Sequence, residues 1–275
     1  RAMGRSHVVF CAVMRPDDHP APPAAYRPLD AFWEGRGYRK LPGAVARFGW
    51  RDLGAAESQP RFPLAFQPGV SLADGALHHH EVLVRFENAH SPFALVRMAE
   101  QFDLIEELDQ AVVEQTVRRL KADRGGAERL AVNVSGLTIT SPRFVAEVES
   151  LIRKDDRLRG RLLFEITESA AIDDLTVADR HIQRLRALGS TVCLDDFGAG
   201  AASLTYLQRL SVDIVKIDGR YVRELVAGGR DAAVVSHVVN LCRELDVRTV
   251  AEMVETPEVE AAVRAAGVDF GQGWY

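Results

Sequence analysis

The sequence predicts an α/β protein with a TIM-type (β/α)8-like barrel. From about residue 61 to residue 275, short apolar segments typical of buried strands alternate with longer segments whose apolar residues recur at helical spacing. This alternation builds a parallel sheet covered by helices, and the chain holds enough strand and helix units to close the sheet into a barrel. Polar residues recur at the ends of the predicted strands, and a barrel gathers those ends on one face.

Length, composition and charge limit the class of protein. The 275 residues suffice for one large domain or two modest ones, and the contents of 47% hydrophobic and 27% charged residues are ordinary for a globular protein. The formal net charge of −5 offers no basic surface to a nucleic-acid polymer. We expect no membrane span, because no run of about 18 apolar residues occurs. The 3 scattered cysteines favour a reduced, cytoplasmic setting and fit no zinc motif.

Residues 1–60 differ in composition from the rest of the chain and are rich in proline. The stretch Arg27 to Trp33, followed by Arg36-Gly37-Tyr38 and by Phe48 to Asp52, resembles the carboxyl end of an acetyl-CoA-dependent N-acetyltransferase. The glycine-rich pyrophosphate loop that such enzymes need is absent. We therefore predict a small, non-catalytic α/β appendage and linker over residues 1–60, followed by the main domain over residues 61–275.

The elements of the main domain follow from apolar periodicity and from turn and capping residues. Strands are expected at residues 62–68, 78–86, 129–135, 162–168, 191–196, 212–218, 247–252 and 268–272. Helices are expected at residues 93–101, 105–119, 141–152, 172–188, 203–210, 231–245 and 256–267. Ser141-Pro142 and Thr256-Pro257 are helix starts, because proline fits the first helical turn and Ser141 can cap it. Gly189 and Gly267 end the helices that precede them.

The strand at residues 191–196 ends in two adjacent acids. Asp195 and Asp196 follow a short apolar run, and Gly198 and Gly200 lie in the loop behind them. Paired carboxylates repel each other unless a cation lies between them, so the pair predicts a divalent-metal site at the mouth of the sheet. Two solvated acids before a tight turn would have the same local sequence, and the other strands must decide between the two interpretations.

The other predicted strands carry polar residues at the same position. The residues at or near the carboxyl ends of their strands are Asn133, Glu165, Asp195, Lys216, Glu252 and Gln272. They lie about one β/α unit apart, so a barrel would bring them together on its catalytic face. Glu81 and Arg85 share one face of the strand at 78–86, where a carboxylate and a guanidinium need ligands if they are buried.

The candidate donors are all oxygen atoms, which favours Mg²⁺ or Mn²⁺ over zinc. The proposed ligands are Glu81, Asn133, Glu165, Asp195, Asp196 and Glu252. Asp195 is best placed to bridge two ions about 3.5–4 Å apart, a spacing that clamps a phosphate and activates a water. Lys216 would orient that water or stabilise phosphoryl charge, and Arg85 would pair with a phosphate. Phosphodiester hydrolysis is the reaction class that fits this set.

Three consecutive histidines precede Glu81 and suggest a second metal cluster. Adjacent strand residues point to opposite faces, so at most His78 and His80 can share a side. We therefore expect the histidines to form a partly solvated strand start rather than a metal site.

The motifs together resemble those of the EAL domain family, bacterial phosphodiesterases that open cyclic di-GMP. The matching motifs are Gln67-Pro68, Glu81-Val82-Leu83-Val84-Arg85, Asn133-Val134-Ser135, Glu165-Ile166-Thr167-Glu168, Asp195-Asp196-Phe197-Gly198, Lys216-Ile217-Asp218, Glu252-Met253-Val254-Glu255 and Gln272-Gly273. The resemblance covers residues 62–275 and implies a first strand that runs opposite to the others. It implies cyclic di-GMP as substrate, linear pGpG as product and a homodimer.

The resemblance also implies roles for individual residues. The six oxygen ligands would hold two Mg²⁺ or Mn²⁺ ions, and Ca²⁺ should inhibit because its coordination is looser. The implied catalytic residues are Lys216, Glu252, Gln272 and Glu168. Among them, Lys216 and Gln272 would hold the attacking water, and Glu168 would anchor the loop after Asp196. The implied substrate-binding residues are Gln67, Arg85 and Glu255.

The chain departs from the family pattern at a few positions. Ala201 and Ala202 replace a tyrosine and a serine, Met253 replaces a glycine, and Arg97 replaces a proline. The sequence stops at Tyr275, so we expect the last barrel helix to be missing and the chain to be less stable than a full barrel. Two alternatives to the enzyme remain: an EAL-type receptor that binds cyclic di-GMP without hydrolysing it, and an N-acetyltransferase based on the first segment.

Overall fold

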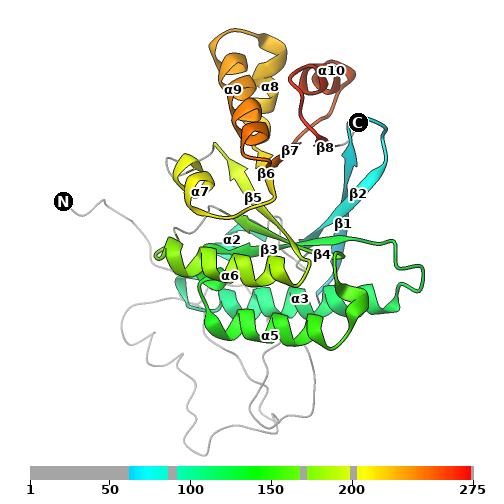
Figure 1. The fold of residues 1–275 in the computed structure, drawn as a ribbon, viewed down its shortest axis with the longest axis vertical. Helices are drawn as coiled ribbons and strands as arrows, with labels where there is room; N and C mark the ends of the chain where they lie inside the picture. The colour runs from blue at the N-terminus through cyan, green and yellow to red at the C-terminus, as the bar shows by residue number, and fades with distance from the viewer. Residues whose placement is uncertain (1–61, 86–91, 168–171, 199–202, 274–275) are drawn as a thin grey trace, which may run out of the picture. The chain divides into compact units, whose positions relative to one another are not determined.

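The described part of the computed structural model is a closed barrel of eight strands surrounded by helices (Figure 1). It covers residues 62–85, 92–167, 172–198 and 203–273, all within one compact unit, Phe62–Tyr275. The predicted appendage over residues 1–60 lies outside the described residues, as do Cys11, Arg27 to Asp52 and the loop positions Ala201 and Ala202.

The strands follow one another around the barrel in chain order. Their bounds are β1 Leu64–Ser71, β2 Leu77–Val84, β3 Leu130–Ser135, β4 Leu162–Thr167, β5 Thr191–Phe197, β6 Ile214–Ile217, β7 Arg248–Ala251 and β8 Phe270–Gln272. Neighbouring strands from β2 to β8 are parallel, whereas β1 is antiparallel to both β2 and β8. The predicted barrel with a reversed first strand is confirmed.

Helices connect the parallel strands. Their bounds are α2 Pro92–Gln101, α3 Ile105–Ala122, α4 Gly136–Ile139, α5 Pro142–Arg153, α6 Leu175–Ala187, α7 Ser203–Arg209, α8 Gly219–Ala227, α9 Arg230–Glu244 and α10 Pro257–Ala265, with a 3-10 turn at Asp156–Leu158. Both predicted helix starts are present, and the predicted Ser141 cap is confirmed, because Ser141 Oγ accepts from the Phe144 amide. Thr256 Oγ1 caps its helix in the same way by accepting from the Val259 amide.

Helices α4 and α8 were not expected from the sequence. Helix α8 begins directly after Asp218, whose carboxylate accepts from the Arg220 amide at 2.7 Å and so caps the helix. From the sequence, Asp218 was assigned to the end of the preceding strand, and residues 219–227 were given no element. The observed strand β6 stops at Ile217, one residue before the cap.

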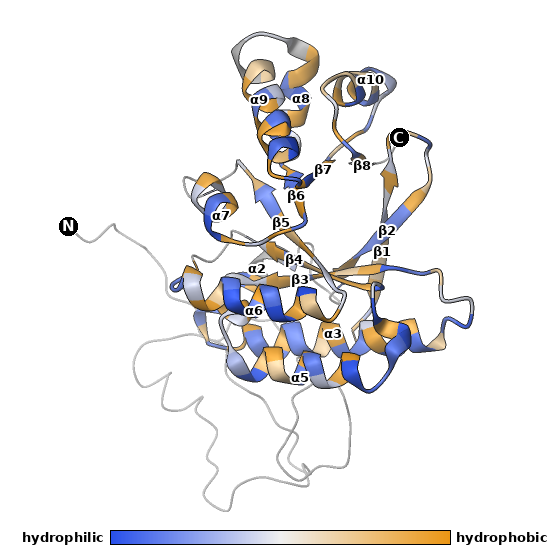
Figure 2. Cartoon of the chain, in the orientation of Figure 1, coloured by the Kyte–Doolittle hydropathy of each residue, from blue (hydrophilic) through white to orange (hydrophobic). Residues whose placement is uncertain are grey.

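Two apolar clusters hold the helices against the outside of the barrel. In the larger cluster, α3, α5 and α6 pack side by side against β3, β4 and β5, through residues such as Val113, Phe144, Ile182 and Phe164. In the smaller cluster, α8, α9 and α10 pack on β6 and β7 through Val222, Val239, Val263 and other residues. Figure 2 shows the mixture of apolar and polar residues along α3, α5 and α6, as expected for helices with one buried face.

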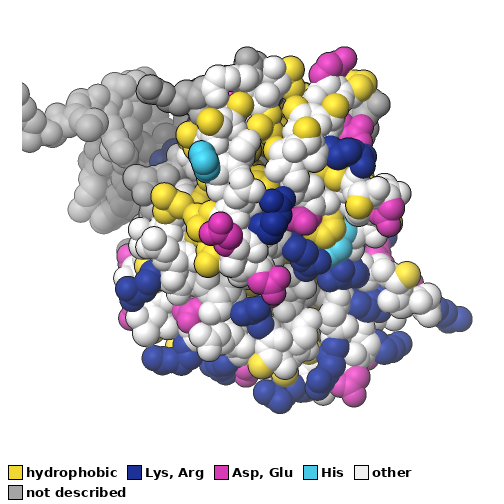
Figure 3. Space-filling model, turned by 45° about the horizontal axis from the view of Figure 1, so that its top comes forward, with side chains coloured by type: hydrophobic (Ala, Val, Ile, Leu, Met, Phe, Trp, Pro, Cys, Tyr) yellow, Lys and Arg dark blue, Asp and Glu magenta, His cyan; other side chains and the backbone are white. Residues whose placement is uncertain are grey.

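Charged side chains of both signs are mixed on the surface. On the face shown in Figure 3, Lys and Arg side chains are interspersed with Asp and Glu rather than gathered in one basic area. Among the helices in the described ranges, none is both long enough and apolar enough to cross a membrane.

Candidate metal and catalytic site

The interior of the barrel is built in layers, because alternate residues of each strand point inward. The lower layer is apolar where β5 to β8 meet, and its members are Cys193, Ile214, Val250 and Phe270. Two residues further along each of these strands, the polar layer begins. Its members are Glu81, Asn133, Glu165, Asp195, Lys216, Glu252 and Gln272. The sequence therefore places one polar residue in or directly after each of the strands β2 to β8, above an apolar layer.

Lys216 lies at the centre of the polar layer and is only 1% exposed. Its Nζ is 3.1 Å from Glu81 Oε2, 2.9 Å from Glu165 Oε2, 3.1 Å from Asp195 Oδ1 and 3.1 Å from Glu252 Oε1. These four acids come from β2, β4, β5 and the end of β7, so a single buried ammonium joins strands from around the whole barrel.

Glu81 is also held by two side-chain amides. Asn133 Nδ2 donates to Glu81 Oε1 at 2.8 Å, and Gln272 Nε2 donates to Glu81 Oε2 at 2.6 Å. The other amide atom of Gln272, Oε1, is buried without a hydrogen-bond partner among the described residues. An unpaired buried acceptor is costly, so this oxygen is available to a donor that enters the site.

The acids outnumber the cations, and their pKa values reflect this. Burial raises the pKa of Glu165 well above its ordinary value, and the neighbouring Glu81 and Asp195 raise it further. Burial likewise raises the pKa of Glu252 to about 8 and that of Asp196 to about 6, with Asp195 adding to both. For Glu81, burial is outweighed by Lys216 and by the two amide donors, so its pKa is lowered.

Lys216 remains charged in this environment. Burial alone would lower its pKa, but the surrounding carboxylates raise it well above the ordinary value. The cluster thus keeps one buried positive charge and carries an excess of acids, which is the electrostatic condition under which additional cations bind favourably.

Two overlapping groups of acids are close enough to hold metal ions. Oxygen atoms of Glu81, Glu165 and Asp195 lie within 4.8 Å of one another, and so do those of Asp195, Asp196 and Glu252. Asp195 belongs to both groups. The donors are all carboxylate oxygens, with Asn133 beside them, so the residues present fit hard divalent ions such as Mg²⁺ or Mn²⁺.

The backbone at Asp196 explains how two adjacent strand residues reach the same site. Asp196 has a left-handed conformation, with φ of 54°, and the pairing of β5 with β6 is irregular between Leu194 and Phe197. A regular strand would turn the two carboxylates to opposite faces. The irregularity brings Asp196 back toward Asp195 and Glu252.

Of the predicted substrate-binding residues, one lies on the strand beside Glu81 and two lie on exposed segments. Gln67 lies directly across from Glu81 in the pairing of β1 with β2 and is half-buried. Arg85 follows β2 and is exposed, with Nη1 donating to the Val84 carbonyl at 3.3 Å. Glu255 is exposed in the segment after β7. Glu168 lies outside the described residues.

The three histidines lie at the start of β2 as expected, and His78 and His80 are partly exposed, but His79 is buried. His79 is only 3% exposed, and its Nε2 lies 3.6 Å from Glu165 Oε1, directly below the carboxylate cluster. Side chains two residues apart on a strand share a face, so the position of His79, two residues before Glu81, already indicated that it points into the barrel. His78 is half-buried, and its ring packs against that of Phe270.

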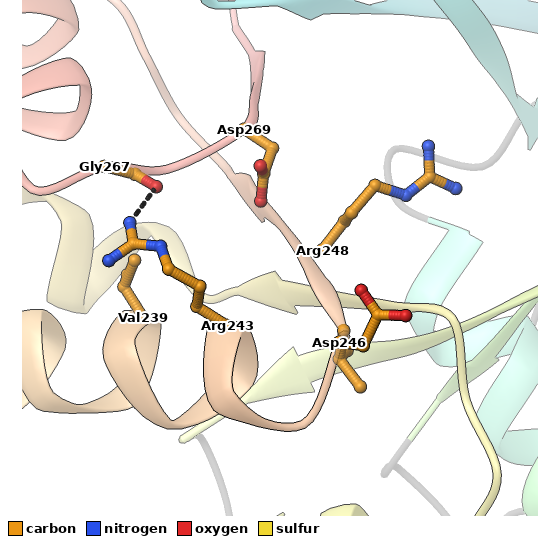
Figure 4. A pocket seen from close by; sticks show the side chains of 7 residues that line it. Val239, Arg243, Asp246, Arg248, Gly267 and Asp269 are labelled. Carbon is orange, nitrogen blue, oxygen red and sulfur yellow. Dashed lines mark hydrogen bonds between the residues drawn. The ribbon is translucent and has the colours of Figure 1, made fainter.

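A separate surface pocket lies at the opposite end of the barrel (Figure 4). It is lined by Arg243, Asp246, Arg248 and Asp269, among others, near the start of β7 and just before β8. Figure 4 shows Arg243 bonded to the Gly267 carbonyl while the Arg248 side chain extends in another direction. The carboxylate cluster is at the carboxyl ends of the strands, so this pocket is not part of it.

Comparison with known proteins agrees with the geometry. The EAL domain model matches residues 50–275. The cyclic di-GMP phosphodiesterase PdeF of Escherichia coli K12 is 34% identical over 202 residues, which cover 71% of this chain and 27% of PdeF. The cyclic di-GMP phosphodiesterase NbdA of Pseudomonas aeruginosa is 31% identical over 230 residues, which cover 81% of this chain and 29% of NbdA. The matches therefore span less than a third of each relative.

A solved structure shows the same fold. The PaMucR phosphodiesterase, in a complex with c-di-GMP, superposes with a TM-score of 0.70 and 31% sequence identity. The superposition covers 78% of this chain and 89% of that one.

Proposed function

Because this chain belongs to the EAL domain family, we propose that it hydrolyses cyclic di-GMP to linear pGpG with the help of two Mg²⁺ or Mn²⁺ ions. The observation that carries the proposal is the pair of acid groups that share Asp195, since one bridging carboxylate between two ion sites is the arrangement that clamps a phosphate. The names of PdeF and NbdA and the ligand of PaMucR support the choice of substrate.

Within this proposal, Glu81, Asn133, Glu165, Asp195, Asp196 and Glu252 would hold the ions. When bound, the ions would supply electrostatic stabilisation of the phosphate and would lower the pKa of an attacking water. The unpaired Oε1 of Gln272 would accept a hydrogen bond from that water, and the Lys216 ammonium would hold it from the other side. Both groups are buried, so their positions are set before substrate arrives.

Substrate contacts are proposed for the residues around the mouth of the barrel. Arg85 has an exposed guanidinium that donates through Nη1 to its neighbour's carbonyl. No described residue accepts from its other N–H groups, which would pair with a substrate phosphate. Gln67 and Glu255 would contact the substrate, and Glu168 would anchor the loop that follows Asp196. Homodimer formation and a cytoplasmic location remain predictions from the sequence.

The direct test is to incubate the chain with cyclic di-GMP and Mn²⁺ or Mg²⁺ and to measure pGpG by chromatography. Replacing Glu81 with alanine removes a carboxylate from one ion group, and we expect a loss of turnover larger than the about 10–100-fold typical of residues that only support metal ligands. The exposed Glu244 at the end of α9 supplies a control, because Glu244→Ala also removes a carboxylate but should leave turnover unchanged.

Two outcomes would change the proposal. Binding of cyclic di-GMP without any pGpG would favour the receptor over the enzyme. Equal turnover in Glu81→Ala and the wild-type chain would contradict the assigned ion site. Replacing Mn²⁺ with Ca²⁺ should inhibit, because the longer and looser coordination of Ca²⁺ would relax the clamp on the phosphate.

A further inference from the structure

His79 lies inside the barrel in direct contact with one of the carboxylates of the site. Its Nε2 is 3.6 Å from Glu165 Oε1, just beyond the length of a hydrogen bond, so the contact is electrostatic in this structure. The ring fits because Gly69 on the neighbouring strand β1 has no side chain. A Cβ at Gly69 would lie 2.7 Å from His79 Cε1, closer than side chains approach each other.

A chain of polar contacts extends from His79 away from the site. His79 Nδ1 lies 2.9 Å from His78 Nδ1, and His78 Nε2 lies 3.0 Å from Arg129 Nη1. Arg129 is itself held by a bond from its Nε to the Gly160 carbonyl at 3.0 Å. The series of contacts therefore runs from Arg129 to His78, then to His79 and finally to Glu165.

Arg129 determines which imidazole nitrogens carry protons. A guanidinium can only donate, so His78 Nε2 must accept from Arg129. Neutral His78 then has its proton on Nδ1 and donates it to His79 Nδ1, which leaves the proton of neutral His79 on Nε2, facing Glu165. Each ring therefore has one nitrogen that accepts and one that donates, so both rings are neutral.

We propose that Arg129, His78 and His79 form a directed donor chain that orients the Glu165 carboxylate, and that His79 is a positioning residue of the metal site. The inference rests on the proposed function, since it takes Glu165 to be a metal ligand. One Glu165 oxygen, Oε2, accepts from Lys216, and the other, Oε1, faces His79 Nε2. The Lys216 hydrogen bond at one oxygen and the electrostatic contact with His79 at the other restrict rotation of the carboxylate, as groups that support metal ligands generally do.

The tautomers are measured first, on the metal-free chain, by two-bond ¹H–¹⁵N correlation of ¹⁵N-labelled histidine. We expect His78 protonated on Nδ1 and His79 protonated on Nε2. In Arg129→Met the donor is lost, and the His78 signals should shift toward a mixture of tautomers. A proton on His79 Nδ1 in the wild-type chain would overturn the proposal, and this measurement needs neither metal nor activity.

Mn²⁺ affinity in the absence of substrate is the second readout. His79→Leu fills the space without a donor, and we expect a loss of about 10–100-fold in Mn²⁺ affinity, as for other supporting residues. His79→Gln keeps an N–H donor and should restore most of the affinity, which a purely space-filling role would not predict. Gly69→Ala should weaken binding as His79→Leu does, because its Cβ displaces the His79 ring.

The results separate the two proposals. Tight Mn²⁺ binding that His79→Leu leaves unchanged would overturn only the donor chain. No Mn²⁺ binding by the wild-type chain would overturn the proposed function and the inference that rests on it. If His79→Leu does not fold, the wild-type tautomers and the Gly69→Ala affinity still decide the question.

Discussion

At the scale of single residues, the site contains more buried carboxylates than cations to neutralise them. Glu165 and Glu252 have raised pKa values because burial and neighbouring acids disfavour their charged forms. In the metal-free protein such groups take up protons on folding, so their contribution to stability is lost as the pH rises toward the folded pKa. His78 and His79 change the free energy of unfolding in the opposite sense: because burial lowers their pKa values from 6.5, their contribution rises with pH below 6.5.

The two effects can be separated by pH. The histidines titrate only below about pH 6.5, their value in the unfolded chain. Between pH 6.5 and 8, we therefore expect the free energy of unfolding of the metal-free protein to fall as pH rises, by up to about 1.4 kcal/mol per pH unit for each proton. Glu252→Gln should flatten this slope, because it removes the group with a pKa of about 8. Urea titrations at several pH values measure it, and a rising slope would contradict the assignment.

Met253, directly after Glu252, has a backbone conformation that side chains rarely adopt. Its φ is 55°, and a Cβ on Gly219, at the start of α8, would overlap Met253 Cγ and lie 2.6 Å from Met253 Cβ. We expect Gly219→Ala to destabilise the protein by about 1–3 kcal/mol, the usual cost of overpacking. In the Met253→Gly background the same change should cost far less, because the atoms it meets are gone.

Urea unfolding of the two single variants and the double variant tests this coupling. Additive effects would mean that Met253 and Gly219 do not contact each other. Relief of the left-handed strain at Met253 offsets part of the added chain entropy of glycine, so Met253→Gly alone should change stability by less than about 1 kcal/mol.

At the scale of elements, helix α3 anchors the end of strand β3 beside the site. The buried Asp109 of α3 accepts from the Ser135 amide at 2.9 Å, two residues after Asn133. Burial raises the pKa of Asp109 to about 7. This single contact ties the packing of a helix outside the barrel to the position of a side chain inside it.

Asp109→Leu should leave the buried Ser135 N–H without a partner and cost about 1–3 kcal/mol. Asp109→Asn keeps an acceptor oxygen and should cost less. Hydrogen exchange of the Ser135 amide measures the effect locally, with faster exchange expected in the leucine variant than in the asparagine variant. Equal exchange in both variants would show that the contact does not hold the strand end.

At the scale of the whole molecule, the site joins strands that are far apart in the chain. Glu81 on β2 and Gln272 on β8 are 191 residues apart in sequence, yet they share a hydrogen bond of 2.6 Å. Metal binding to ligands from β2, β3, β4, β5 and the end of β7 should therefore stabilise the barrel as one unit rather than one loop.

A Mn²⁺ titration followed by thermal unfolding tests this expectation. At a free Mn²⁺ concentration of about 100 times Kd, the folded state should gain about 2.7 kcal/mol. Glu81→Ala should gain much less at the same concentration, whereas Glu244→Ala should behave as the wild-type chain does. A rise in Tm that is equal in all three proteins would indicate nonspecific binding at the surface.

Much of this architecture could be predicted from local sequence patterns. Apolar periodicity and the caps at Ser141 and Thr256 predicted the alternating strands and helices, and the polar strand ends predicted that Glu165, Asp195 and Lys216 would meet. The role of His79 was missed because three identical neighbours obscured which of them shares the face of Glu81. Helix α8 was missed because its capping residue, Asp218, was assigned to the end of the preceding strand.

The sequence by itself determined the order of the elements and the chemistry of the donors, because both depend on local periodicity and residue type. Only the tertiary structure decided that four carboxylates share the single Lys216 ammonium and that Arg129 contacts the imidazole of His78. Those contacts depend on the stagger of the strands around a closed barrel. Distances between residues far apart in the chain arise only when the barrel closes.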